Sequence, residues 1–244
     1  SRICGYGRRL PGQGLRFRAC PSNEFEYEPR PATRRAARWP RSTTRGILAD
    51  RIAPGIGAAE FSAGKDFGEL DSPQPTAAGD KVEVIEFFSF GCGHCANLEP
   101  HLVEWASSPA ADGVNLVRIP VAWNPGMESL ARVYYAAEMA GGSKKADAAV
   151  FKLIHEDQPD GLSLELIADV IAAEGVDKAA FIQNFQSPEV TAKVQNAKEM
   201  TKRYKITGVP TLVVDGRYTV QIPRGNDIER MFAVTDYLVA EAAE

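Results

Sequence analysis

The sequence is poor in the residues that build metal centres and membrane spans. Only three histidines and four cysteines occur among its 244 residues. A structural zinc site on one cysteine pair needs two more soft ligands, and the remaining cysteines, Cys4 and Cys20, lie far from the other two along the chain. No apolar run approaches the roughly 18 residues that mark a transmembrane helix. Composition therefore disfavours both a zinc module and a membrane-spanning protein.

Lysine is absent from the first sixty residues, and the charges of the chain are unevenly distributed. Residues 1–60 hold 12 Arg and 5 acidic residues, whereas the remaining 184 residues hold 16 basic and 27 acidic ones. Only the first segment has the charge to attract nucleic acid, and the acidic remainder argues against a nucleic-acid-binding protein.

Residues 1–60 also lack a helical or strand period, and glycine and proline recur in them. This pattern predicts a disordered or poorly structured segment. The Arg-rich stretch 34–45 and the weakly apolar stretch 47–59 are compatible with a targeting sequence, although charges and a proline interrupt the apolar part. We interpret the segment as a clipped leader or as upstream sequence outside the mature protein. Its cysteines, Cys4 and Cys20, are then incidental.

The most informative stretch joins a predicted strand to a predicted helix through two cysteines. Residues 81–90 are β-branched and aromatic without a breaker and predict a buried strand. Residues 96–105 carry apolar side chains at helical spacing. The Cys-Gly-His-Cys sequence at 92–95 places Cys92 at the first turn of this helix, where free N–H groups and the positive dipole end favour a thiolate. We expect a reactive disulfide here.

Further elements are predicted from the chain that follows. Residues 114–121 alternate and predict a strand, so that strand, helix and strand make a right-handed βαβ unit with a parallel sheet. Pro100 lies inside the first helix and is expected to kink it. From Asn124 the chain reads as helices for about eighty residues, with apolar stripes typical of a small bundle core. The residues expected to cap or open these helices are Ser143, Ser163, Asp177 and Ser187-Pro188.

Strand character returns near the end of the chain. Residues 211–214 and 217–222 predict a hairpin, because Asp215-Gly216 between them is a strong turn signal. Asn226 is expected to cap a last helix. The order βαβ, helical block, ββα indicates that the helical block interrupts one α/β domain, which starts near Phe61.

Several of these motifs resemble the thioredoxin fold. They are the cysteine motif after a strand, Pro100 five residues beyond Cys95, and Gly208-Val209-Pro210 before the hairpin. The helical block and the run Glu-Phe-Phe-Ser-Phe at 86–90 resemble the DsbA type of thiol:disulfide oxidoreductase, found in the bacterial periplasm. The resemblance implies a thioredoxin fold with an inserted helical domain: 61–123 as the first half, 124–203 as the insertion and 204–244 as the second half.

The same resemblance implies how the site is built. It implies a cis peptide bond before Pro210, with Val209 beside the cysteines, and a client-binding surface that these two residues share with Gly93. It also implies a buried carboxylate at Glu86. Two positions depart from the family: Gly93 replaces the usual proline, as in protein disulfide isomerase, and Gly91 replaces a usual aromatic residue. These departures bear on the redox potential and on the peptide-binding surface.

Thiol chemistry assigns the roles. Cys92, at the helix end, is expected to be the attacked or attacking sulfur, and Cys95, one turn further in, the resolving partner. His94 can donate to the Cys92 thiolate or balance its charge, which lowers the pKa of Cys92 and makes the disulfide more oxidising. Glu86 can assist proton transfer from Cys95 if it is buried; the alternative is an edge carboxylate on a solvated strand. The remaining histidines, His101 and His155, are expected on helix surfaces.

We therefore predict a periplasmic oxidase that forms disulfides in exported proteins and uses its cysteine pair without a cofactor. The resemblance implies a monomer that a membrane-bound, DsbB-like partner reoxidises. An isomerase or reductase of the same fold remains an alternative, although isomerases of this compartment usually dimerise through an extra domain. A redox-inactive or metal-binding module is a further alternative. Relatives among the glutathione transferases share the helical insertion but generally lack the second cysteine.

Overall fold

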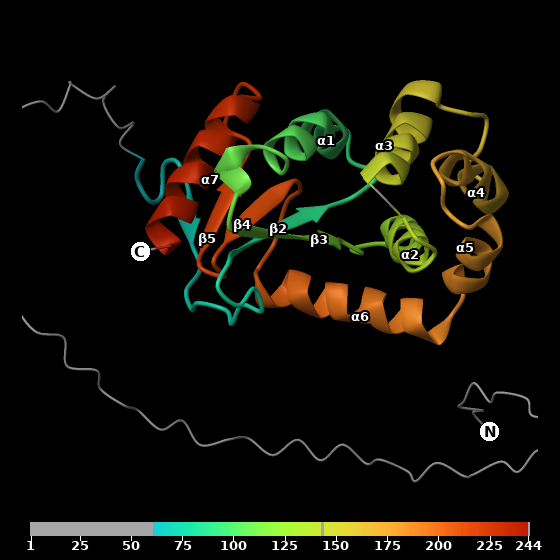
Figure 1. The fold of residues 1–244 in the computed structure, drawn as a ribbon, viewed down its shortest axis with the longest axis horizontal. Helices are drawn as coiled ribbons and strands as arrows, with labels where there is room; N and C mark the ends of the chain where they lie inside the picture. Colours follow the sequence, from blue (N-terminus) through green and yellow to red (C-terminus); the bar gives the residue numbers. More distant parts are fainter. Residues whose placement is uncertain (1–60, 143, 244) are drawn as a thin grey trace, which may run out of the picture. The chain divides into compact units, whose positions relative to one another are not determined.

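The computed structural model describes residues 61–142 and 144–243, so the predictions for residues 1–60 and for a cap at Ser143 lie outside the described residues. Figure 1 shows the arrangement of the elements. The strands are β1 (Gly68–Glu69), β2 (Val82–Phe88), β3 (Val114–Pro120), β4 (Thr211–Val214) and β5 (Tyr218–Gln221). The α-helices are α1 (Gly93–Trp105), α2 (Pro125–Met139), α3 (Lys144–Lys152), α4 (Leu164–Ala173), α5 (Lys178–Phe185), α6 (Pro188–Arg203) and α7 (Ile228–Ala242). A 3-10 turn, η1 (Pro109–Ala111), and a π-helical turn, η2 (Leu153–Asp157), complete the list.

One mixed sheet holds the five strands in the order β1-β5-β4-β2-β3. The inner strand β2 is buried along its whole length, and it runs parallel to β3 and antiparallel to β4. With α1 between β2 and β3, the predicted parallel βαβ unit is confirmed. In this register Glu86 lies opposite Arg118 of β3, which brings a carboxylate beside a guanidinium. The short strand β1 was not predicted, because two residues show no period.

Alternation along β2 gives the sheet two apolar faces. Val84 points into one core with α1 and α7, whose contributions include Leu98 and Leu238. Ile85 and Phe87 point into the other core, which is continuous with the helical block. Figure 1 shows α1 and α7 on one side of the sheet and α6 on the other. Helix α1, which begins at the cysteine motif, is thus fixed by packing against the sheet.

The helical block runs from α2 to α6, and side chains cap its helices as the sequence predicts. Ser163, Asp177 and Ser187 each accept a hydrogen bond from the N–H group three residues further on. Asn124 does the same for α2. Such caps each contribute about 1 kcal/mol to helix stability.

The cap predicted for the last helix is wrong by one residue. Asp227, not Asn226, is the N-cap of α7, and its side chain accepts from the N–H of Arg230. Asn226 instead has a left-handed φ of 62°. A left-handed residue cannot take the extended N-cap conformation, so it forms the preceding turn.

Two turns complete the fold. Asp215 and Gly216 have φ values of 51° and 61°, which are the signature of the predicted type I′ hairpin. Helix α3 passes directly into η2, whose C-cap residue, Gln158, has a left-handed φ of 42°.

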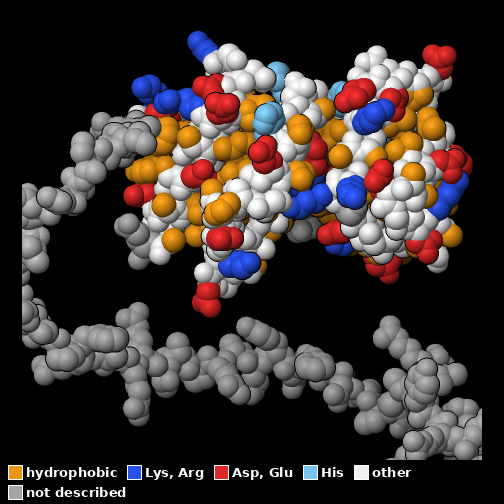
Figure 2. Space-filling view, turned by 45° about the horizontal axis from the view of Figure 1, so that its top comes forward, with side chains coloured by type: hydrophobic (Ala, Val, Ile, Leu, Met, Phe, Trp, Pro, Cys, Tyr) orange, Lys and Arg blue, Asp and Glu red, His pale blue; other side chains and the backbone are white. Residues whose placement is uncertain are grey.

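The surface of the described part carries charges of both signs. Figure 2 turns the face of α1 and α7 toward the reader and shows basic, acidic and hydrophobic side chains interspersed on it, without a large patch of one sign. Of the described helices, none combines the length and apolarity needed to cross a bilayer.

Candidate active site

The two cysteines lie where β2 passes into α1. Cys92 is the N-cap residue of α1 and has an extended backbone, with φ −100° and ψ 117°. Its side chain makes no capping hydrogen bond, so its sulfur stays available beside the first-turn N–H groups. Cys92 is half-buried, Cys95 is buried, and both are free thiols. The structure therefore describes the reduced state of a dithiol.

Hydrogen bonding separates the pKa values of the two thiols. A hydrogen bond from the Cys95 thiol has the largest effect on the pKa of Cys92, which it lowers. The N–H groups of Cys95 and His94 and the charge of His94 lower this pKa further. Although burial opposes the change, the pKa of Cys92 falls from 9.0 to about 5. The pKa of Cys95 is raised, first because its hydrogen is donated to Cys92 and then because the group is buried. At neutral pH Cys92 is a thiolate and Cys95 keeps its proton.

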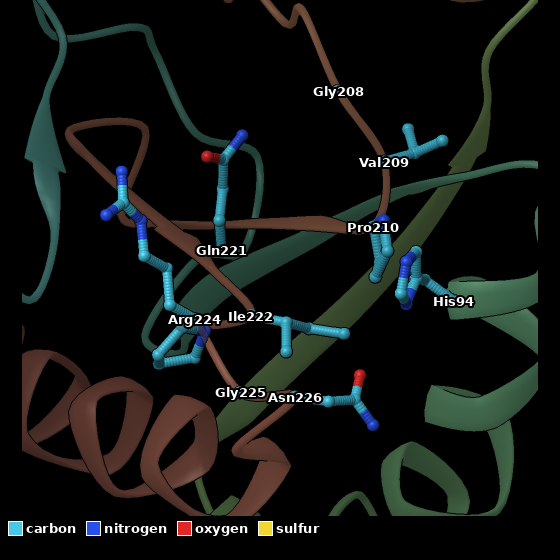
Figure 3. A pocket seen from close by; sticks show the side chains of 10 residues that line it. His94, Gly208, Val209, Pro210, Gln221, Ile222, Arg224, Gly225 and Asn226 are labelled. Carbon is cyan, nitrogen blue, oxygen red and sulfur yellow. The ribbon is translucent and has the colours of Figure 1, made fainter.

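His94 contributes more through its backbone than through its imidazole. Its N–H group lowers the pKa of Cys92 more than its charge does. The side chain is exposed, where solvent screens its charge, and lies beside Pro210 at one end of a groove (Figure 3).

The loop before β4 lies against Cys92. The peptide bond between Val209 and Pro210 is cis, as the family resemblance implied. The Cys92 sulfur lies 3.4 Å from the carbonyl oxygen of Val209. A Cys92 thiol can donate to this oxygen, whereas a thiolate cannot and accepts from Cys95 and the helix N–H groups instead. The two protonation states of Cys92 thus use different partners.

A groove of about 410 Å³ opens beside this loop. Figure 3 shows His94, Val209 and Pro210 at one end of the groove and Gln221 and Arg224 at the other. A cleft of this size can accept a few side chains of a peptide. The remaining lining residues are Gly208, Ile222, Pro223, Gly225 and Asn226.

Glu86 is fully buried, which excludes the alternative of a solvated edge carboxylate. The Nε atom of Arg118 donates to Glu86 Oε2 over 2.6 Å. The same guanidinium binds Glu99 of α1 through Nη2 at 2.5 Å and Asp147 of α3 through Nη1 at 2.9 Å. One cation therefore holds three carboxylates, from the sheet, the active-site helix and the helical block.

This buried cluster has more carboxylates than cations. Burial raises the pKa of Glu86, and Arg118 only partly offsets the effect. Burial likewise raises the pKa of Asp147 to about 7. Glu86 Oε1 has no hydrogen-bond partner among the described residues. Asp147 can therefore exchange a proton near neutral pH, and the charge of Glu86 is close enough to raise the pKa of Cys95.

Sequence reasoning missed Arg118, Glu99 and Asp147. Each carried a signal, because each is a charged residue at a position where the local period predicts an apolar side chain. Arg118 lies within a strand, and Glu99 and Asp147 lie beside apolar residues of a helix. Their partners could not be read from such a signal, because the contacts join β2, β3, α1 and α3.

The prediction for His155 is wrong. This residue is half-buried, and its Nε2 atom lies 2.7 Å from the carbonyl oxygen of Phe90, two residues before Cys92. His101 is exposed on α1, as expected. Within residues 61–142 and 144–243, no group of three or more His, Cys, Asp or Glu side chains is arranged to hold a metal ion. Cys4 and Cys20 lie outside the described residues.

The family model of the "DSBA-like thioredoxin domain" matches residues 102–238. The matched region begins after Cys95, so it covers most of the fold but not the cysteine motif.

Two similar curated proteins are both named thiol:disulfide interchange protein DsbA. The one from Pseudomonas aeruginosa is 34% identical over 182 residues, which cover 75% of this chain and 86% of that protein. The one from Burkholderia cepacia is 35% identical over 202 residues, which cover 81% of this chain and 95% of that protein. Their similarity extends over most of both lengths.

Solved structures of DsbA proteins are also similar to this chain. The crystal structure of Pseudomonas aeruginosa DsbA matches with a TM-score of 0.68 at 33% identity and covers 75% of this chain and 94% of its own. That of the oxidoreductase DsbA from Xylella fastidiosa matches with a TM-score of 0.67 at 32% identity and covers 74% of this chain and 97% of its own.

Proposed function

This chain belongs to the family of the DsbA-like thioredoxin domain and is a thiol:disulfide oxidoreductase, and we propose that it forms disulfides in exported client proteins through Cys92 and Cys95. The observation that carries this proposal is the placement of the two thiols: half-buried Cys92 is the N-cap of α1 with its sulfur beside the Val209 carbonyl, and buried Cys95 lies one turn further in. A stabilised Cys92 thiolate is a good leaving group, and its stability favours the reduced enzyme, which makes the disulfide form an oxidant.

The first step starts from the oxidised enzyme. A client thiolate attacks the Cys92 sulfur, the Cys92–Cys95 bond breaks, and a mixed disulfide joins the client to Cys92. The electron pair of the broken bond goes to Cys95, which has a raised pKa and takes up a proton. Glu86 is a candidate to relay that proton, because it is buried within electrostatic reach of Cys95 and has a raised pKa itself.

A second client thiolate completes the reaction. It attacks the client sulfur of the mixed disulfide, so the client disulfide forms and Cys92 leaves as a thiolate. The hydrogen bond from Cys95 and the N–H groups of His94 and Cys95 stabilise that thiolate. The client has lost two electrons and the enzyme has gained them.

The client surface is proposed to combine Gly93, Val209 and Pro210 with the groove of Figure 3. Gly93 is exposed at the start of α1, and a side chain there would meet no atom within 4 Å. The carbonyl of Val209, beside Cys92, is free to accept from a client N–H group in the disulfide form, because Cys92 then carries no hydrogen to donate. A client backbone could therefore pair with the Val209 peptide while its cysteine meets Cys92.

The cellular setting is part of the proposal. Proteins named DsbA support action on exported proteins, and the periplasm supplies the oxidising compartment that persistent disulfides need. We propose that the enzyme acts there as a monomer and that a membrane-bound, DsbB-like partner removes the two electrons. Neither oxidation nor reoxidation requires a cofactor bound to this chain.

The test of the cysteine roles is a trapping experiment. Cys95→Ser removes the resolving thiol, so when the Cys92 thiolate of the variant attacks the disulfide of an oxidised client and releases one client thiol, the mixed disulfide through Cys92 should persist and be visible by mass spectrometry. Cys92→Ser is the matched control and should trap none. In the reduced protein near neutral pH, alkylation should modify Cys92 first. Preferential labelling of Cys95 would overturn the assignment.

A further inference from the structure

The reacting cysteine lies between two glycines, and hydrogen bonds from neighbouring side chains fix the loop that carries it. Gly91 and Gly93 flank Cys92, so the local sequence restricts the backbone very little. The turn closes when the N–H of Cys92 donates to the carbonyl of Ser89 over 3.0 Å. In addition, the N–H of Gly91 donates to the Ser89 hydroxyl over 3.2 Å.

The other support comes from the helical block. His155 belongs to η2, and its Nε2 atom lies 2.7 Å from the carbonyl oxygen of Phe90. Because a carbonyl oxygen only accepts, Nε2 carries the hydrogen and donates it. The ring lies 6.3 Å from that of Phe151, and the Gln158 amide donates to the His155 carbonyl over 2.8 Å. His155 is therefore held in place on a π-helical turn, a feature that is frequent at functional sites.

The hydrogen bonds of His155 and Ser89 fix the two polar groups of one peptide unit. The carbonyl of the Phe90–Gly91 peptide accepts from His155, and its N–H donates to Ser89. Turning this peptide over converts a type I turn to a type II turn, which needs a left-handed φ at its third residue. That residue is Gly91, which could adopt such a φ easily but does not do so here. The two hydrogen bonds select one of two accessible turns.

We propose that His155 is a positioning residue for disulfide exchange: by holding the Phe90 carbonyl, it keeps Cys92 in the turn that directs its sulfur to the N–H groups of α1. The proposal rests on the role of Cys92 as the reacting cysteine. The ring nitrogen of His155 contacts the Phe90 carbonyl, so His155 acts through the loop. A purely structural role of His155 would change the stability of the protein but not the acidity of the Cys92 thiol.

The test compares three variants. His155→Phe keeps an aromatic ring beside Phe151 but removes the donor, His155→Gln keeps a donor, and His101→Phe changes an exposed histidine of α1 as a matched control. The acid dissociation constant of the Cys92 thiol is measured from the pH dependence of its alkylation in the reduced protein. His155→Phe should lower this constant about two- to tenfold, the effect of one ordinary hydrogen bond. His155→Gln should recover part of the loss, and His101→Phe should match the wild type.

A wild-type constant in folded His155→Phe overturns the proposal, whatever its thermal stability. If His155→Phe does not fold, Ser89→Ala decides, because it frees the other end of the same peptide: a lowered constant supports the proposal and an unchanged one overturns it. The function is tested separately. Failure of the wild type to oxidise client dithiols would defeat the proposed function, while the acidity comparison would still decide the role of His155.

Discussion

The sulfur of Cys92 lies 3.4 Å from the carbonyl oxygen of Val209, so the loop before β4 contacts the N-cap residue of the active-site helix. As a thiol, Cys92 donates to this oxygen. As a thiolate it depends on Cys95 and on the N–H groups of α1. The Val209 carbonyl is therefore open to a client N–H group whenever Cys92 carries no hydrogen, as a thiolate or in a disulfide.

The ionisation itself gives a first prediction. The ultraviolet absorbance of the thiolate in the reduced protein should follow a titration with a midpoint near pH 5, where the pKa of Cys92 lies. Cys92→Ser should remove the transition. A midpoint close to 9.0, the ordinary value for this thiol, would show that the N–H groups and Cys95 do not stabilise the thiolate.

The same pKa predicts how stability depends on pH. The folded-state pKa of Cys92 is depressed, so the stability that its thiolate contributes is complete above pH 9 and is lost as the pH falls to about 5. The oxidised protein has no such thiol. Thermal unfolding at several pH values should therefore show the advantage of the reduced form over the disulfide form shrinking as the pH falls through this window. An advantage that does not vary with pH would contradict the assignment.

Arg118 gives a third prediction. Arg118→Met leaves the buried carboxylates Glu86 and Glu99, with Asp147, without their cation, which should cost about 3–5 kcal/mol of unfolding free energy at neutral pH. Uncompensated burial raises folded-state carboxyl pKa values, so the loss should grow as the pH rises above the unfolded values and shrink in acid. Chemical denaturation at acidic and neutral pH measures it.

A matched control is Arg217→Met. Arg217 is exposed and lies 3.9 Å from Asp215, so the change should cost less than about 1 kcal/mol at either pH. Equal losses for the two variants would mean that the Arg118 cluster is solvated in solution.

The redox potential is the fourth prediction. We expect a value between those of DsbA, about −120 mV, and protein disulfide isomerase, about −180 mV. The stabilised Cys92 thiolate makes the disulfide oxidising, while Gly93 gives the isomerase-type dipeptide. Equilibration with glutathione, followed by Trp fluorescence, measures it. A value near the thioredoxin figure of about −270 mV would make the protein a reductase.

Gly93→Pro isolates the effect of the dipeptide. Gly93 is the first residue of α1, where proline is favoured, and no atom lies within 4 Å of the position a side chain would take. The variant should fold like the wild type and become more oxidising. A potential that does not move, or moves toward reduction, would show that the dipeptide does not account for the difference.

The last prediction concerns the length of chain that activity needs. A chain shortened to residues 61–244 should retain dithiol oxidation, because the described core and the cysteine loop lie within it. A chain starting at Ala77 should unfold more easily, since it loses β1 and the Phe61 ring, which contacts Tyr237 and Arg230 of α7. Loss of activity in the 61–244 chain would show that residues 1–60 take part.

Local patterns in the sequence determined the order of the elements and the place of the chemistry. The buried strand before Cys92, the caps at Ser163 and Asp177, and the Asp215-Gly216 turn depend on residues close together in the chain. Backbone conformation responds to such neighbours, so periodicity and capping predict it. The position of Cys92 at a helix N-terminus, and hence its thiolate character, follows from the same local signals.

Tertiary structure alone decided what surrounds the cysteines. Glu86 meets Arg118 because β2 and β3 pair in one register, and Arg118 reaches Glu99 and Asp147 only because α1 and α3 pack over that edge of the sheet. His155 reaches Phe90 across 65 positions of sequence. Such pairings have no local signature, since a charged or imidazole side chain looks the same in sequence whether it faces solvent or a buried partner. The packing of helices against the sheet decides whether such a side chain faces solvent or a buried partner.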